Sequence, residues 1–167
     1  VHSTENPGGE VRGQILIDGL APTMSPMMSP MMQSAVGNAI NVTLSGGQEL
    51  PPITSNVTGT ATIELLSEGT IGYYVSLLNP SGVALLGVAG AHIHCAASGM
   101  NGPVVAVLAQ PVDGGLLTSP VEFSGVLDDS SIVEDTCGAT IAMLYASIRS
   151  GSAYINVHST ENPGGEV

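Results

Sequence analysis

The two ends of the chain carry the same eleven residues, because residues 1–11 (VHSTENPGGEV) reappear without change as residues 157–167. The copies begin at positions 1 and 157, so they are offset by 156 residues. A tandem array with this period, an overlapping circular permutant and a short local duplication would each explain the identity. The two copies are halves of one motif. The β-like segment 154–158 leads into the C-terminal copy, and the β-like segment 10–17 follows the N-terminal copy. We therefore expect one unit of a tandem array, with a complete core in each unit.

The composition favours a β-domain made of many short strands. The 167 residues include 22 Gly and 11 Pro but no Trp and one Phe, and this length suits one domain with some linker. Alternating or β-branched patterns predict strands at residues 39–45, 58–66, 70–78, 88–95, 103–109 and 121–127.

One helix is predicted at residues 140–149. Its apolar side chains follow the i, i+3, i+4, i+7 spacing of a helix face, and Gly151 stands where a helix stop belongs. The fold class is therefore all-β: an antiparallel, Greek-key-like β-sandwich with one short helix.

The chain divides into three predicted parts. Residues 1–17 are the closing strand of the preceding repeat, residues 18–38 are a Met/Pro/Ser-rich linker, and residues 39–167 are the sandwich. Prolines four residues apart favour an extended linker, whose MxxM spacing could bind Cu(I) or simply pack against apolar surface. Strand sharing between units predicts that residues 10–17 pair with a different copy, and the alternative is that they fold back on their own body.

The charge balance excludes several partner classes. Two Arg and no Lys face fourteen acidic residues, for a net charge of −12, so nucleic acid would be repelled. No apolar run is long enough for a membrane helix, and no membrane insertion is expected. Two acidic pairs, Asp128-Asp129 and Glu134-Asp135, form a solvated loop or a candidate Ca²⁺ site.

Cysteines and sequons favour an extracellular location. Cys95 and Cys137 predict one disulfide, with buried thiols or a thiolate metal ligand as alternatives. Asn41 and Asn56 each begin an N-x-Thr sequon for N-glycosylation.

Three blocks resemble the CHRD (chordin-type) domain family. They are LSGGQELPP (44–52), AHIH (91–94) with the later GPVV (102–105), and GSAYINVHS (151–159). The resemblance implies a secreted or surface β-sandwich domain, and the sequence departs from the family at Cys95, where Gly is usual. The growth-factor binding of chordin is not transferred on fold alone.

Three histidines form a candidate metal site. His92 and His94 share one face of a strand, and His158 lies on another strand, so the three could ligate Zn²⁺ or Cu²⁺, with Glu166 as a candidate fourth ligand. Mutual hydrogen bonds beneath the turn are the alternative interpretation. The strands are also similar to those of copper–zinc superoxide dismutase, but only one further histidine, His2, exists to complete such a site.

From these features we predict a structural repeat of an extracellular, glycosylated filament or surface fibre, whose partners are identical neighbouring repeats and glycans, and not an enzyme. The alternative hypothesis is a secreted metal- or ligand-binding adhesive module. A copper enzyme of the dismutase type is a third.

Overall fold

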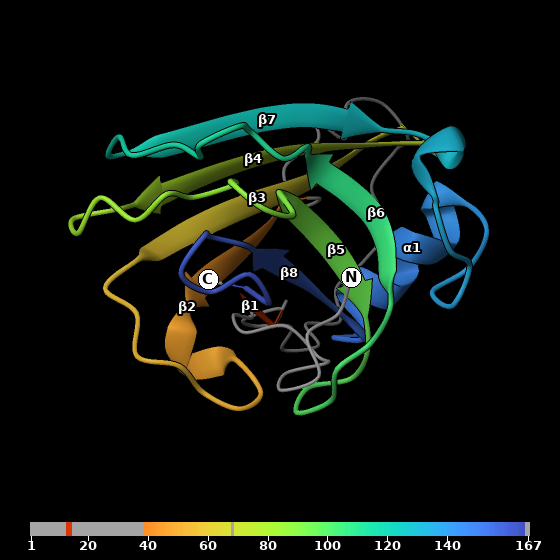
Figure 1. Ribbon diagram of the computed structural model, residues 1–167. Coiled ribbons are helices and arrows are strands. Elements are labelled where there is room, and N and C mark those ends of the chain that lie inside the picture. Colours follow the sequence, from red (N-terminus) through yellow and green to blue (C-terminus); the bar gives the residue numbers. More distant parts are fainter. Residues whose placement is uncertain (1–12, 15–38, 68, 166–167) are drawn as a thin grey trace, which may run out of the picture.

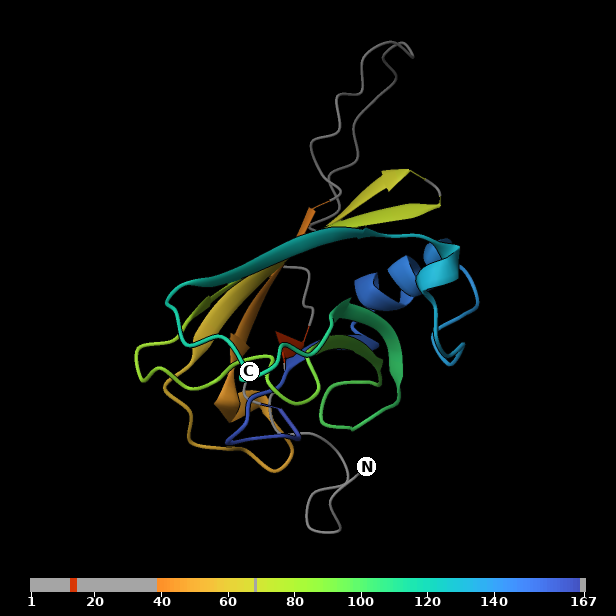
Figure 2. The same ribbon diagram turned by 45° about the horizontal axis from the view of Figure 1, so that its top comes forward.

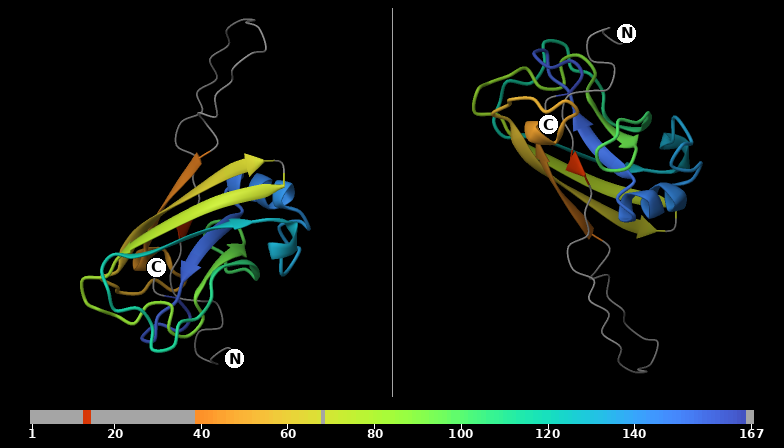
Figure 3. Two further views of the ribbon diagram at one scale, coloured as in Figure 1. Left: turned by 90° about the horizontal axis from the view of Figure 1, so that it is seen from above. Right: turned by 90° about the horizontal axis from the view of Figure 1, so that it is seen from below.

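Two antiparallel sheets pack face to face in the computed structural model, which describes residues 13–14, 39–67 and 69–165 (Figures 1 and 2). One sheet has the order β2 (Ala39–Ser45), β3 (Thr58–Ser67), β4 (Thr70–Leu78) and β7 (Val121–Leu127). The other has the order β1 (Gly13–Gln14), β8 (Ala153–Val157), β5 (Ala91–Cys95) and β6 (Val104–Ala109). Figure 3 shows the first sheet in front of the second from one side and behind it from the other. The all-β sandwich prediction is confirmed.

Alternation along the strands determines which side chains form the core. In β2, Ile40, Val42 and Leu44 are buried, while the residues between them face solvent. Successive side chains of a strand point to opposite faces, so this pattern leaves one apolar face, and that face packs against the second sheet. The chain changes sheet between β1 and β2, β4 and β5, β6 and β7, and β7 and β8, which gives the Greek-key-like connectivity.

Helix α1 (Ile141–Arg149) lies at one end of the sandwich (Figure 1). Its buried face consists of Ile141, Leu144, Tyr145 and Ile148, and these side chains belong to the same core cluster as the strands. The helix begins one residue later than predicted because Thr140 is the N-cap, and its side chain accepts a hydrogen bond from Met143 N at 3.4 Å. Two short 3-10 turns, η1 (Gly46–Gln48) and η2 (Asp129–Ser131), were not predicted.

The strand-sharing prediction is wrong for the part of the N-terminal segment that the structure describes. Gly13 pairs with Ile155 and Gln14 with Tyr154 of the same chain, so β1 completes the second sheet without a neighbouring copy. This is the fold-back alternative. The remaining residues of the predicted strand, and the linker with its MxxM spacing, lie outside the described residues.

Strand β8 is buried on both faces, and the three histidines lie at its buried outer face. Ala153, Ile155 and Val157 join the core on the inner face. Tyr154 and Asn156 alternate with them on the outer face, where they are 1% and 0% exposed. A buried outer face means that loops cover this part of the second sheet, and it is there that the histidines lie.

Candidate metal centre

Neighbouring strands bring the three predicted histidines to one sheet face. In the register of β5 and β8, His92 lies opposite Asn156 and His94 lies opposite Tyr154. His158 comes two residues after Asn156 and therefore shares that outer face. The ring of His92 lies 5.9 Å from that of His94 and 5.0 Å from that of His158, measured between centroids.

The histidine nitrogens converge on a common point. One ligand atom from each residue lies within 4.8 Å of the others, and His92 Nδ1 is 3.0 Å from His158 Nε2. A tetrahedral ion with metal–nitrogen bonds of about 2.0–2.1 Å would hold such nitrogens about 3.3–3.4 Å apart. Modest ring movements would therefore close the site around one ion. The predicted grouping of the three residues is confirmed, and Glu166 lies outside the described residues.

Two backbone carbonyls determine which nitrogens carry lone pairs. Gly102 O lies 3.0 Å from His94 Nδ1, and Pro163 O lies 3.0 Å from His158 Nδ1. A carbonyl only accepts, so each Nδ1 carries the proton and each Nε2 carries the lone pair. Metal-binding histidines almost always donate their second N–H to a carboxylate, a backbone carbonyl or water, and this contact also orients the ring. The alternative interpretation was that the histidines hydrogen-bond to one another. This contact is also present, because His92 and His158 hydrogen-bond to each other.

A loop folds closely over His94. Tyr154 stacks on the His94 ring at a centroid distance of 4.9 Å, and its hydroxyl accepts a hydrogen bond from Gly102 N at 3.2 Å. A Cβ at Gly102 would lie 1.9 Å from Cys95 O, so only glycine allows this approach. The resemblance to the family had marked Gly102, and its role is to bring a carbonyl onto the histidine.

Burial favours the neutral form of His92 and His158. Burial is the main cause that lowers the pKa of His158 to about 4, and the neighbouring His92 ring acts in the same direction while the Pro163 carbonyl opposes it. Burial also lowers the pKa of His92. Neutral imidazole is the form that binds metal, so burial prepares the ligands near pH 7.

Comparison with known proteins identifies the family of the chain. The family model described as the CHRD domain matches residues 40–167, which is most of the chain. The chain belongs to the CHRD domain family. No match was found among curated proteins or among solved structures. Within the described part of this CHRD domain, no helix is both long and apolar enough to cross a membrane.

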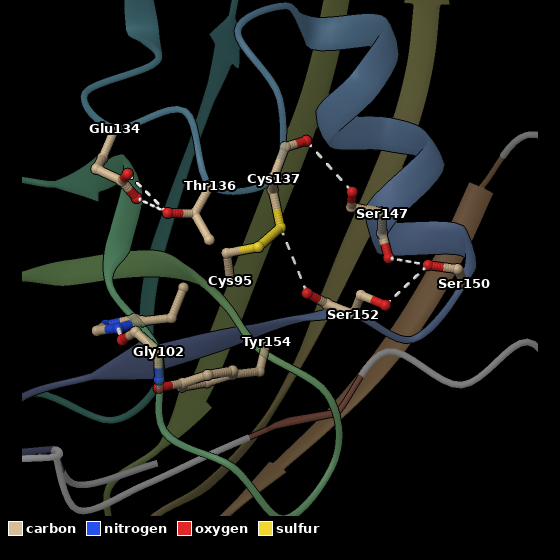
Figure 4. The surroundings of a disulfide bond; sticks show 10 residues. Cys95, Gly102, Glu134, Thr136, Cys137, Ser147, Ser150, Ser152 and Tyr154 are labelled. Atoms are coloured by element: carbon tan, nitrogen blue, oxygen red, sulfur yellow. Dashed lines mark hydrogen bonds between the residues drawn. A yellow bond between two sulfur atoms is a disulfide. The ribbon is translucent and has the colours of Figure 1, made fainter.

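The predicted disulfide of the CHRD domain is confirmed. Cys95 at the end of β5 is bonded to Cys137 in the loop that leads into α1, with a Cα–Cα distance of 5.6 Å (Figure 4). Figure 4 also shows Ser147 bonded to the Cys137 carbonyl and Tyr154 beside Gly102. The bond excludes the thiol and thiolate-ligand alternatives, and it anchors the residue that directly follows His94.

The acidic pairs do not assemble into a cation site. Asp128 caps η2, where its carboxylate accepts from Ser130 N at 2.9 Å, and Asp129 accepts from Ile141 N at 2.7 Å. Glu134 accepts from Thr136 Oγ1 at 2.6 Å. Across residues 39–67 and 69–165, the histidine cluster is the only group of three or more His, Cys, Asp or Glu with ligand geometry. Of the two interpretations, a solvated loop and a Ca²⁺ site, these contacts favour the loop, which the carboxylates stabilise.

Both sequon asparagines are accessible. Asn41 is exposed on β2, where its Oδ1 accepts a hydrogen bond from Thr62 Oγ1 at 3.0 Å, and Asn56 is exposed in the loop before β3. N-glycosylation of Asn41 and Asn56 stays a prediction.

Sequence reasoning missed the partners of the histidines. Asn156 is fully buried beside His92, and its Nδ2 donates to Gly164 O at 3.4 Å. The carbonyls of Gly102 and Pro163 were also missed, because every residue has a carbonyl and only tertiary structure selects those that meet a ring. The alternation of Tyr154, Asn156 and His158 was the one available signal for Asn156.

Lowering the pH should destabilise the metal-free protein through His158. The unfolded histidine takes up a proton near pH 6.5, but the folded one does so only near pH 4, so stability is complete above pH 6.5 and falls as the pH approaches 4. We expect a loss of about 3 kcal/mol from this residue, measured by urea unfolding with a chelator present. His158→Gln should remove this part of the pH dependence, and an unchanged dependence would contradict the assignment.

Proposed function

We propose that this CHRD domain is an extracellular module that binds one transition-metal ion, Zn²⁺ or Cu²⁺, through His92, His94 and His158. One observation carries the proposal: two carbonyls orient two buried imidazoles so that their lone pairs converge with the third ring within 4.8 Å. Nitrogen ligands of this kind suit zinc and copper. His92 is only half-buried, so an ion could enter on its side.

We propose that the domain binds the ion and is not an enzyme, because a dismutase-type copper site needs more histidines than the chain has. The chain has four histidines; His92, His94 and His158 form the cluster, and His2 lies outside the described residues. A three-histidine set leaves one coordination position for water or for another ligand. Glu166 is our candidate for that position, as the sequence suggested.

Several features support the extracellular location. The disulfide is of the kind that persists in oxidising environments, and the two exposed sequon asparagines, Asn41 and Asn56, can accept glycans there. Glycans at both residues are part of this proposal.

The test is the metal stoichiometry of the purified protein. After incubation with excess Zn²⁺ or Cu²⁺ and gel filtration, elemental analysis should give about one ion per chain, because three ligands hold one ion. His92→Ala, a change at the least buried ligand, should abolish retention of the ion.

The duplicated motif supplies a matched control. His2 and His158 have identical neighbours within the eleven residues, so His2→Ala should keep one ion whereas His158→Ala should lose it. Equal retention by His2→Ala and His158→Ala, or no ion in the unaltered protein, would overturn the proposal.

A second candidate function rests on the duplication itself. A motif repeated at an offset of 156 residues supports a tandem array, in which this CHRD domain is a structural unit of an extracellular fibre and its partners are identical units. The length of the parent gene tests it. A coding length that accommodates several 156-residue periods is expected, and a single period would contradict it.

A further inference from the structure

Asn156 is an unusual buried residue in this domain. Its side chain is 0% exposed, and among the described residues its Oδ1 accepts no hydrogen bond. Leaving a buried acceptor without a donor is costly. The other buried asparagine, Asn79, differs, because its Nδ2 donates to Val83 O at 2.7 Å and its Oδ1 accepts from Val83 N at 3.0 Å. The absence of a donor to Asn156 Oδ1 among the described residues therefore needs an explanation.

The orientation of the Asn156 amide follows from its one contact. The Gly164 carbonyl oxygen lies 3.4 Å from Asn156 Nδ2 and can only accept a hydrogen bond. The Nδ2 of Asn156 must therefore face the turn, and its Oδ1 must point away from it. The Cα of Asn156 lies directly opposite that of His92 across the β5–β8 pair. Side chains opposite each other on one sheet face have Cβ atoms about 4.5–5.5 Å apart, which brings an amide within reach of an imidazole.

Metal binding changes what His92 requires. Pro163 O holds the proton of His158 on Nδ1, so the 3.0 Å contact between the rings requires His92 Nδ1 to donate to His158 Nε2 in the metal-free protein. Both of these nitrogens must offer lone pairs to an ion. The single proton of neutral His92 then moves to its Nε2, which becomes a new donor that needs an acceptor.

We propose that Asn156 Oδ1 accepts this hydrogen bond and that Asn156 is a positioning residue for the metal centre. The inference rests on the proposed function and deepens it. In the metal-free state the oxygen has no donor among the described residues, and in the metal-bound state it holds His92 in the ligand tautomer. The Nδ2 of the same side chain bonds the turn that carries Pro163.

Two substitutions at this position have opposite expected effects. Asn156→Leu removes, at similar volume, the buried oxygen that accepts no hydrogen bond and the long 3.4 Å hydrogen bond to Gly164 O, so the urea midpoint of the metal-free protein should change little. Its Zn²⁺ dissociation constant should rise about 10–100-fold, as for other outer-shell partners. Asn156→Asp loses the same bond to Gly164 O but keeps the acceptor, so its dissociation constant should stay within a few-fold of the original. Its metal-free urea midpoint should fall because a carboxylate is buried.

The experiment measures both quantities for each protein, the dissociation constant by competition with a chromophoric Zn²⁺ chelator and the midpoint by urea unfolding with a metal-free buffer. Asn79→Leu is the matched control, since it removes a fully bonded buried asparagine and should lower the midpoint without changing the affinity. The inference is overturned if the unaltered protein binds Zn²⁺ and Asn156→Leu binds it equally well, or if Asn156→Asp loses affinity as strongly as Asn156→Leu. Absence of binding by the unaltered protein would instead overturn the proposed function, and the inference with it.

Discussion

Zn²⁺ at about a thousand times its dissociation constant should raise the free energy of unfolding by about 4 kcal/mol, because the ion binds the folded state alone. For a chain of this size, that corresponds to a rise of roughly 10 °C in Tm. The reason is geometric: His92 and His94 come from β5, and His158 follows β8, so their nitrogens meet only when the strands pair. Thermal unfolding followed by circular dichroism, with and without Zn²⁺, measures the shift.

Two variants determine whether that shift arises at the cluster. His92→Ala should remove it, whereas His2→Ala, which changes the copy of the motif at the other end, should leave it intact. An equal shift in both variants would mean that Zn²⁺ binds elsewhere, and the three-histidine centre would then be wrong.

Removing the disulfide should cost about as much stability as the ion adds. The bond joins residues 42 positions apart, and the chain-entropy model assigns a loop of this length roughly 3–4 kcal/mol. We expect the double change Cys95→Ala with Cys137→Ala to lower the free energy of unfolding by that amount, measured by urea unfolding. Part of the loss arises locally, because Cys137 lies in the loop that leads into α1 and is itself buried.

Reduction provides the comparison for this prediction. A reductant should lower the stability of the unaltered protein to that of the double variant and have no effect on the variant. A loss of less than about 1 kcal/mol in the free energy of unfolding would contradict the prediction, because the cross-link would then contribute little to stability.

Much of the fold was predictable because its signals are local. The alternation in residues 39–45 predicts a strand with one apolar face, and the structure buries Ile40, Val42 and Leu44 as that pattern requires. The helix spacing in residues 140–149 is equally local, and α1 begins one residue later only because Thr140 serves as its cap. The i, i+2 spacing of His92 and His94 placed both on one face for the same reason.

The partner of the N-terminal strand was not predictable. The motif duplication showed that residues 10–17 follow the turn, but a strand edge accepts any chain of suitable register. The structure pairs Gly13 and Gln14 with β8 of their own chain. Strand pairing between distant segments depends on the path of the whole chain, and no short sequence pattern records that path.

By itself, the sequence determined the β class, the short helix, the family, the single cysteine pair and the histidine pair on β5. Each of these depends on residue type and on spacing within one element. The sequence proposed His158 as a third ligand, but only the tertiary structure brought it to that pair. The tertiary structure also decided that the Gly102 carbonyl meets His94, that the Pro163 carbonyl meets His158, and that Asn156 is buried beside His92. The physical reason is that these contacts cross between β5, β8 and two covering loops, and they exist only once the sheet has formed.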